Sequence, residues 1–309
     1  CLANCLFVLY NVGIKNEEVF FMSEIKKKKI TIPTYRVGEP EPLPLYFEKR
    51  PYQGASGRIY PIPYVSSLSD DKKDYDYDGY VLENEYIRAV LLPELGGKVH
   101  CALDKTNGYD FIYNNKVIKP AMVGLAGPWV SGGIEFNWPQ HHRPTTFMPV
   151  EHAEGKSDGK KAVFMGEVDY FHQMKGNVAL SVDEGSSVLR AKITVYNQTP
   201  VAHPFMWWAN LAVEIDDDYR VVFPPDVEYV NDHDRRAVLE WPVAKGVYHT
   251  ARPYDYGKGT DIHVSGAIKV PSSFMISKGQ SDMDFVCGYD KNKESGVVTV
   301  ANRHIAPGK

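Results

Sequence analysis

The chain has 309 residues, of which 43% are hydrophobic, 24% charged and 12% aromatic, and this globular composition excludes wholesale disorder. The formal net charge of −4 gives no sign of a surface for nucleic acid or for an anionic membrane. The 25 glycines, 21 prolines and 20 tyrosines favour short strands joined by turns over helices. The 4 cysteines are too few and too scattered to indicate a disulfide framework.

Residues 1–29 are predicted to be a disordered or non-native leader. The apolar run at residues 5–10 is similar to part of an export signal, but no positively charged start and no small-residue cleavage site accompany it. The first methionine is Met22, and the sequence that follows it, MSEIKKKKITI, is typical of a soluble start. We therefore expect residues 1–21 to lie upstream of the true start, with a damaged export signal as the alternative.

Residues 30–78 are predicted to form an extended strap, because proline and tyrosine are frequent between residues 37 and 64. Near its end, Asp74, Asp76, Asp78, Gly79 and Glu85 match the spacing of an EF-hand calcium loop. Such a loop needs a helix on each side, and the flanking residues do not favour helices. We interpret this stretch as an exposed acidic loop.

From residue 79 onward, short runs of alternating apolar and polar residues predict a domain of antiparallel strands, up to residue 309. In RAKITVYN, for example, Ala191, Ile193 and Val195 share one face. The predicted strands are residues 86–92, 98–103, 162–171, 188–196, 205–215, 220–223, 262–270, 274–277, 283–288 and 297–302. Only KPAMVGLAG, residues 119–127, could hold a short helix, so the fold class is mainly β, as a sandwich or stacked sheets. The last predicted strand has no closing element after it, so we expect an open sheet edge there.

The segment GLAGPWVSGGIEFNWPQHHRPTTFMPVEH, residues 124–152, is the strongest candidate for function. Its glycines and prolines predict a long ordered loop, and such loops often carry a binding site. Indole rings are suited to stacking on the C–H face of a sugar, and carboxyl, imidazole and guanidinium groups to acid–base chemistry and hydrogen bonding. The residues in question are Trp129, Glu135, Trp138, His141, His142 and Arg143. The alternative is that Trp138 lies in the core and the two histidines form a structural hydrogen-bond network.

Two further clusters extend the candidate site. In PVAHPFMWWANLAVEI a strand would direct Trp207 and Trp208 to opposite faces, so that one is core, and Asn210 would share the face of Trp208. The segment at residues 241–263 combines aromatic side chains with charged ones that suit a polyhydroxylated ligand; its members are Trp241, His249, Arg252, Tyr254, Asp255 and Tyr256. Arg252 could instead be a structural ion-pair partner. His141, His142, His152 and His203 lack the spacing of a helical metal site, and we expect neither a metal nor a cofactor.

VLENEYIRAVLLPELGGKV, followed by DKTNGYDFIY, resembles the opening strands of the galactose-mutarotase-like (aldose 1-epimerase-like) superfamily. PVAHPFMWWANLAVEI resembles the strand that carries a ring-proximal histidine in mutarotases. Three longer stretches, GGIEFNWPQHHRPTTFMPVEH, DRRAVLEWPVAKGVYHTARPYDYGKGTDIH and SDMDFVCGYD, are similar to an uncharacterised bacterial branch in which this domain precedes tetratricopeptide repeats. The resemblance covers roughly residues 30–309.

The resemblance implies an antiparallel β-supersandwich with a sugar-binding concave face and with its last strands missing from this chain. In aldose mutarotases a histidine donates a proton to the ring oxygen and a late-strand glutamate takes one from the anomeric hydroxyl. Here Asn210 stands where that histidine is expected. The resemblance also implies that the family pattern continues beyond Lys309, so the late-strand glutamate is missing from this chain. Simple mutarotation by the residues of the family is therefore not the first hypothesis.

Our leading hypothesis is a carbohydrate-active domain that hydrolyses a glycoside. Glu135 would be the general acid or base, and His141 or His142 would share that role. Glu151, Asp255 or the missing late-strand residue would supply a second carboxylate. The substrate-binding residues would be Trp129, Trp138, Arg143, Trp208, Asn210, His249, Arg252 and Asp255. The alternatives are an aldose epimerase that uses the histidine pair and a non-catalytic carbohydrate-binding module.

The expected partner is a sugar or oligosaccharide, with an intramolecular contact to downstream helical repeats. We expect no binding to nucleic acid or membrane and a cytoplasmic location.

Overall fold

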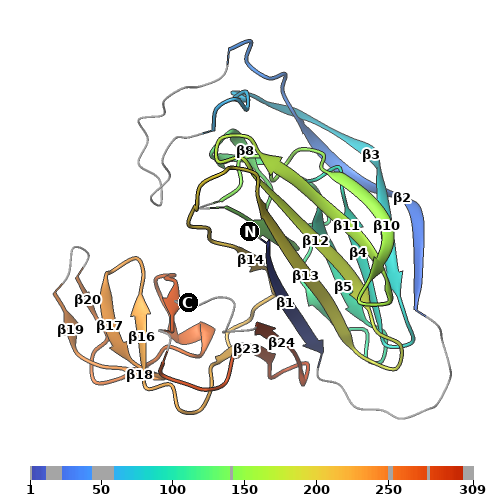
Figure 1. The fold of residues 1–309 in the computed structure, drawn as a ribbon. Helices are drawn as coiled ribbons and strands as arrows, with labels where there is room; N and C mark the ends of the chain where they lie inside the picture. The colour runs from blue at the N-terminus through green and yellow to red at the C-terminus, as the bar shows by residue number, and fades with distance from the viewer. Residues whose placement is uncertain are drawn as a thin grey trace. The chain divides into compact units, whose positions relative to one another are not determined.

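The computed structural model describes residues 2–11, 23–43, 59–139, 142–249, 253–276 and 279–301. The chain divides into two compact units, of which unit 1 comprises residues 1–4 and 16–213 and unit 2 residues 5–15 and 214–309. Almost every element of the described residues is a strand, and the pairs are antiparallel (Figure 1). The predicted mainly antiparallel β class is therefore confirmed. None of the helical residues described could form an apolar span across a membrane.

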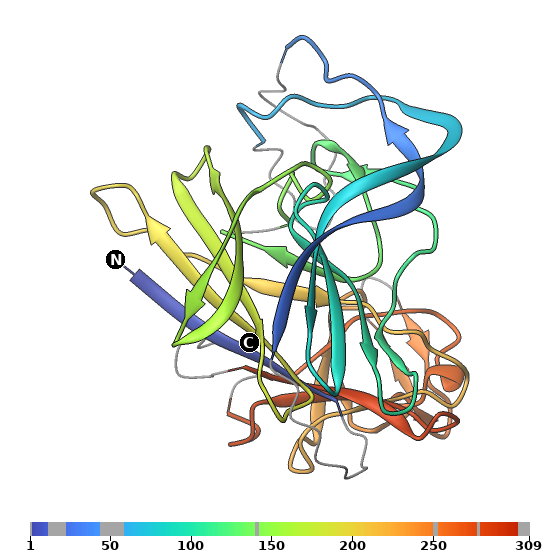
Figure 2. The ribbon, with the colours of Figure 1, turned by 90° about the vertical axis from the view of Figure 1, so that its right-hand side faces the viewer.

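One sheet of unit 1 has the strand order β14-β9-β5-β4-β3-β2, with β6 paired to β5. Its strands are β2 (Glu24–Val37), β3 (Leu68–Glu83), β4 (Ile87–Leu92), β5 (Lys98–Asp104), β6 (Asp110–Ile112), β9 (Ile134–Asn137) and β14 (Trp208–Leu211). Strands β2 and β3 form a long antiparallel pair and curve together (Figure 2). A bulge between Tyr35 and Val37 interrupts their register, which locally bends a strand.

The other strands of unit 1 include an antiparallel run in chain order: β10 (Glu151–Ser157), β11 (Lys160–Asp169), β12 (Met174–Val182) and β13 (Val188–Asn197). Strand β12 packs against β3 and β13 packs against β4, so the two groups of strands form layers. In β13 the side chains of Ala191, Ile193 and Val195 are buried, as the alternating pattern predicted. The buried side chains between the layers include Leu82, Ile87, Leu91, Val99, Val163, Leu180 and Leu189. Each such aliphatic side chain contributes about 1.5–3 kcal/mol by leaving water.

Unit 2 contains a group of strands in the order β1-β24-β23-β15. These strands are β1 (Leu2–Asn11), of which residues 5–11 belong to unit 2, then β15 (Arg220–Val222), β23 (Phe285–Asp290) and β24 (Ser295–Ala301). Residues 7–11 of β1 pair with β24. Because β24 lies between β1 and β23, the prediction of an open edge is wrong for residues 297–301, while residue 302 lies outside the described residues.

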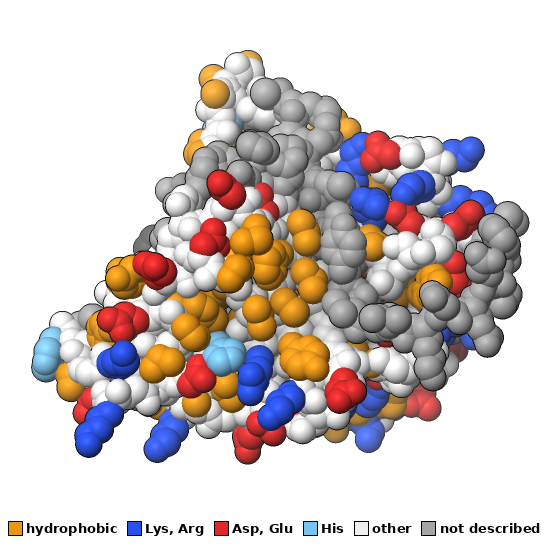
Figure 3. Space-filling model, turned by 90° about the horizontal axis from the view of Figure 1, so that it is seen from below, with side chains coloured by type: hydrophobic (Ala, Val, Ile, Leu, Met, Phe, Trp, Pro, Cys, Tyr) orange, Lys and Arg blue, Asp and Glu red, His pale blue; other side chains and the backbone are white. Residues whose placement is uncertain are grey.

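Smaller sheets complete unit 2. They are built from β16 (Tyr229–Asp232), β17 (Ala237–Glu240) and β22 (Phe274–Met275), from β18 (Val243–Ala244) and β21 (Thr260–Asp261), and from β19 (Val247–Tyr248) and β20 (Tyr254–Asp255). A separate core with Val230, Leu239 and Ile262 lies under them. Figure 3 shows one face of the molecule, on which apolar side chains gather between acidic and basic ones. The exposed apolar residues of unit 2 include Val222 and Tyr289.

Several sequence expectations differ from the observed elements. In the predicted leader, residues 2–11 lie in β1 and residues 24–29 lie in β2. In the predicted strap, residues 30–37 lie in β2 and residues 68–78 lie in β3. The acidic stretch at Asp74–Asp78 is therefore part of a strand and not a loop, with Tyr77 buried between exposed aspartates. The predicted short helix at residues 119–127 is instead the hairpin of β7 (Ala121–Gly124) and β8 (Gly127–Trp129). The predicted strand at residues 262–270 holds the 3₁₀ turn η1 (Ser265–Ala267).

Candidate functional site

Glu135 lies on strand β9, in the middle of the segment that sequence analysis interpreted as a loop. That interpretation is wrong for residues 127–129 and 134–137, which are strands. Two glycines allow the chain to enter β9: Gly132 and Gly133 both have positive φ, and a Cβ on Gly133 would lie 2.2 Å from the carbonyl oxygen of Val99. The glycines thus mark a close approach between β9 and β5, rather than an irregular segment.

Three donors surround the Glu135 carboxylate, whose residue is only 6% exposed. Trp129 donates from Nε1 to Oε2 at 2.7 Å, and Asn137 donates from Nδ2 to Oε1 at 2.8 Å. The Nδ1 of His142 lies 3.4 Å from Oε1 and can donate when it carries a proton. Burial by itself would raise the pKa of Glu135, but the hydrogen bonds from these three residues hold it below its usual value. The side chain is therefore an ionised carboxylate at neutral pH.

Strand β14 adds two side chains to the face that carries Glu135. Asn210 pairs with Glu135 and Trp208 with Asn137, so both project from the same face as their partners. The Trp208 ring packs edge-on against His142, with 4.5 Å between the ring centroids. Trp207 instead stacks against Phe136, which lies on the opposite face. The prediction that Trp207 and Trp208 point to opposite faces is thereby confirmed.

Strand β5 contributes Lys98, which sequence analysis did not select. The pairing of Val99 with Ile134 places Lys98 opposite Glu135 in the antiparallel register. Its Nζ donates to the carbonyl oxygens of Val130 and Ser131 at 3.2 and 3.3 Å, and the residue is 4% exposed. Burial lowers the Lys98 pKa to about 8, against the opposing effect of the Glu135 charge.

His100 shares the strand with Lys98, and its burial, together with the nearby lysine charges, lowers its pKa to about 4. The imidazole is therefore neutral at neutral pH. The signal for both residues was present in GGKVHCALD, where lysine and histidine occur two positions apart in an otherwise apolar strand. Asn137, the other residue that sequence analysis missed, is fully buried and joins the carboxylate to the backbone N–H of Arg143.

Trp138 and Arg143 lie in the interior, where the structure gives them protein contacts. Each is 3% exposed, and the Arg143 guanidinium lies over the Trp138 ring at 4.5 Å. Arg143 also donates to the carbonyl oxygens of Gly96 and Phe136 and forms an ion pair of 2.9 Å with Glu167. These contacts replace the expected stacking wall and hydroxyl clamp, and they agree with the alternative that Trp138 is a core residue. We leave both residues out of the proposed sugar-binding face.

The remaining candidates lie elsewhere or outside the described residues. His249 and Asp255 belong to unit 2; both are exposed, and Asp255 accepts a hydrogen bond from the backbone N–H of Gly257. Glu151 is exposed on β10 and contacts Lys175 at 3.3 Å. His141 and Arg252 lie outside the described residues. Among the described residues, no group of three or more His, Cys, Asp or Glu is arranged to hold a metal ion.

Fold and site together define a mainly antiparallel β domain with an ionised, buried carboxylate on one sheet face. Residues 55–309 match the family model described as "Domain of unknown function (DUF5107)", and the chain belongs to that family. The structure is similar to the crystal structure of a TPR-domain containing protein from Parabacteroides distasonis ATCC 8503, with a TM-score of 0.69 and 23% sequence identity. The match covers 91% of this chain and 44% of that one, so this chain spans less than half of that protein. At this identity the likeness shows the fold alone.

Proposed function

We propose that unit 1 is a carbohydrate-active domain of the galactose-mutarotase-like class, and that its β-supersandwich binds a sugar on the face that carries Glu135. The observation that carries the proposal is the ionised carboxylate held between Trp129, Asn137 and His142. The half-buried rings of Trp129 and Trp208 would supply apolar faces for the C–H groups of a sugar, and the exposed Asn210 amide would hydrogen-bond its hydroxyls.

Proton transfer at a sugar hydroxyl is the chemistry that suits this arrangement. An ionised carboxylate is a base, so Glu135 would take the proton of the anomeric hydroxyl while the bond between C1 and the ring oxygen breaks. His142 in its protonated form would donate a proton to the ring oxygen, and the open-chain aldehyde would then close to the other anomer. Each proton is returned in the closing step, so the reaction is balanced.

This geometry favours anomer exchange over the glycoside hydrolysis that led the sequence interpretation. Hydrolysis with two carboxylates needs a protonated acid and a second carboxyl about 5–9.5 Å away. The low pKa of Glu135 makes it a poor acid, and its contacts within the described residues are all with donors. Hydrolysis stays the second candidate, and a non-catalytic sugar-binding module, with a docking contact to helical repeats, is the third.

Proton NMR of anomeric signals tests these candidates on a panel of aldoses and oligosaccharides. We expect the protein to speed exchange between α and β anomers, and Glu135→Gln to lower the rate by about 10²–10⁴-fold. Glu151→Gln, which removes an exposed carboxylate, is the matched control and should leave the rate unchanged. New reducing-end signals would assign a hydrolase instead. Sugar binding without either reaction, preserved in Glu135→Gln but lost in Trp208→Ala, would assign a binding module.

A further inference from the structure

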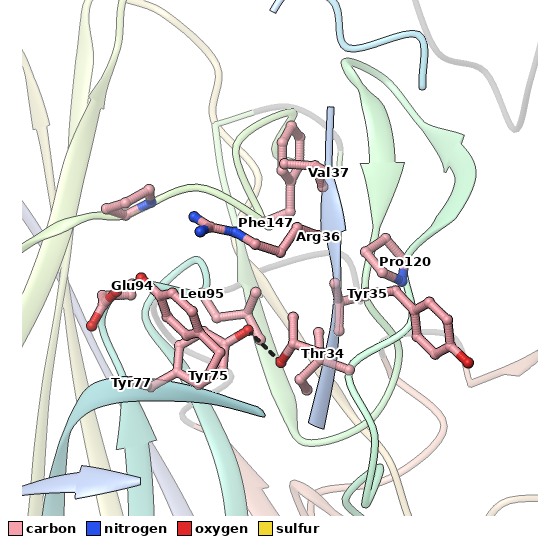
Figure 4. A pocket seen from close by; sticks show the side chains of 13 residues that line it. Thr34, Tyr35, Arg36, Val37, Tyr75, Tyr77, Glu94, Leu95, Pro120 and Phe147 are labelled. Atoms are coloured by element: carbon pink, nitrogen blue, oxygen red, sulfur yellow. Dashed lines mark hydrogen bonds between the residues drawn. The ribbon is translucent and has the colours of Figure 1, made fainter. Parts of the chain in front are cut away.

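A cavity of about 180 Å³ in unit 1 is lined by none of the residues that hydrogen-bond to Glu135. It is bordered by the end of β2, by the middle of β3 and by the loops after β4 and before β10 (Figure 4). In that view, Arg36, Tyr75 and Glu94 lie to the left of strand β2, and Tyr35 and Pro120 lie to its right. The proposed sugar site does not explain this cavity. We therefore infer which ligand it binds from the residues that line it.

The inner part of this cavity is apolar. Leu95, Ile118, Val130 and Phe147 line it, and all four are buried. A polar group pressed against such side chains loses its hydrogen bonds to water without replacement, at a cost of several kcal/mol. The ligand must therefore place a hydrocarbon group here.

The hydroxyl groups at the polar end of the cavity already donate hydrogen bonds within the protein. Thr34 donates to the carbonyl oxygen of Ile32 at 2.9 Å, so in its 3.1 Å contact with Tyr77 the tyrosine must be the donor. Tyr75 donates its proton to Oε2 of Glu94 at 3.0 Å. Both tyrosine oxygens and the Glu94 carboxylate can therefore only accept further hydrogen bonds. This end of the cavity calls for a ligand group that donates, and a carboxylate among aromatic rings favours a cationic one.

Arg36 supplies a positive charge near the Glu94 carboxylate. Its guanidinium lies over the Tyr75 ring at 4.9 Å, and among the described residues no carboxylate forms an ion pair with it. A guanidinium held by a ring still has N–H groups at its edge, which match a carboxylate in a two-pronged hydrogen bond. Tyr75 thus contacts both an available cation and an acceptor-rich anionic group.

We propose that this cavity binds a zwitterionic α-amino acid with an apolar side chain. Glu94 and the tyrosine oxygens receive its ammonium group, Arg36 receives its carboxylate, and the apolar inner part receives its side chain. The cavity volume of about 180 Å³ is large enough for such a side chain, because a closed cavity of roughly 150 Å³ holds a ring of six carbons. A sugar would place hydroxyls against the apolar inner part, a fatty acid would leave the acceptors without a donor, and a simple amine would meet the Arg36 charge without compensation.

Isothermal titration calorimetry with L-leucine tests the proposal on the 309-residue chain. We compare leucine with 4-methylpentanoate, which lacks the ammonium group, with 3-methylbutylamine, which lacks the carboxylate, and with D-glucose. Leucine should bind at least tenfold more tightly than each of the other three, since each of the two analogues loses one charged contact and glucose has neither charge. Equal affinity for leucine and either analogue would overturn the recognition of a zwitterion, as would a preference for glucose or no binding of leucine.

Two variants test whether leucine binds in this cavity. Arg36→Met keeps the stem of an exposed side chain and removes the charge, so the protein should fold normally and its affinity for leucine should fall about tenfold or more. Its affinity for 3-methylbutylamine should not fall, because that ligand has no carboxylate. Glu135→Gln should leave leucine binding unchanged, which separates this proposal from that of the sugar site. Unchanged leucine affinity in Arg36→Met would overturn the assignment.

Discussion

Replacing Glu135 by glutamine should destabilise the protein by an amount that depends on pH. The carboxylate accepts hydrogen bonds from Trp129 and Asn137 at 2.7 and 2.8 Å, and both oxygens serve as acceptors. A glutamine has only one acceptor oxygen, so its NH₂ group would face one of these donors. Hydrogen bonds to charged groups contribute about 1.5–3 kcal/mol each, and a buried donor left alone costs about 1–3 kcal/mol. A neutral glutamine costs less free energy to bury than an ionised carboxylate, and this offsets part of the loss. We therefore expect the free energy of unfolding to fall by about 1–3 kcal/mol at pH 7.

The sign of the pH dependence follows from the direction of the pKa shift. In the folded protein the pKa of Glu135 lies below its usual value of 4.5. The stabilisation is therefore fully present above the unfolded-state pKa and is lost as the pH falls through the folded-state pKa. Above about pH 5.5 the difference between wild type and Glu135→Gln should be constant. Below about pH 4.5 it should shrink, because Glu135 then becomes protonated and neutral, as glutamine is at every pH.

Urea unfolding between pH 3.5 and 7.5, followed by circular dichroism, measures the free-energy difference between the two proteins. For a unit of about 200 residues, each kcal/mol also corresponds to about 2–4 °C in Tm. Glu151→Gln, an exposed carboxylate, should change stability by less than about 0.5 kcal/mol at any of these pH values. A Glu135→Gln protein as stable as wild type at pH 7, or a difference that does not decrease in acid, would refute the argument.

Two other substitutions test the packing and the buried lysine. Gly176→Ala would place a Cβ 2.2 Å from the ring of Trp138, so unfolding by urea should reveal a loss of about 1–3 kcal/mol, and an unchanged midpoint would contradict the packing. The Lys98 pKa of about 8 lies below its usual 10.5, so the unfolded chain binds more protons between these values and wild-type stability should rise with pH there. Lys98→Met should lack this rise, which is on the order of 3 kcal/mol, and parallel pH profiles of the two proteins would show that Lys98 is not buried as described.

Much of the strand pattern could be predicted from residue order, because the two-residue period of a half-buried strand is a local property. Strand β13 follows this rule, with Ala191, Ile193 and Val195 inside. Strand β9 does not, since its four residues are all buried and include Glu135 and Asn137. Its identity depends on pairing with β5 and β14, which come from distant parts of the chain. Glycines that permit this close approach resemble glycines of a loop when the sequence is read alone.

For the candidate site, too, part could be predicted from residue order and part depends on the tertiary structure. Sequence analysis selected Glu135, His142, Trp129, Trp208 and Asn210, which the structure brings to one neighbourhood or one sheet face. It also selected two residues of the same segment, Trp138 and Arg143, which lie in the interior. An indole or a guanidinium has the same chemistry in a binding site and in a core, and only its neighbours decide between these roles.

The amino-acid sequence by itself determined the mainly β class, the strands with clear alternation, and the segment that carries the candidate site, because each depends on neighbours along the chain. The tertiary structure alone decided the ionised state of Glu135, the burial of Lys98 opposite it, and the cavity in which Arg36 and Glu94 both contact Tyr75. These properties depend on distances between residues of different strands. Burial and pairing set the cost of a charge, and both arise only when distant segments come together.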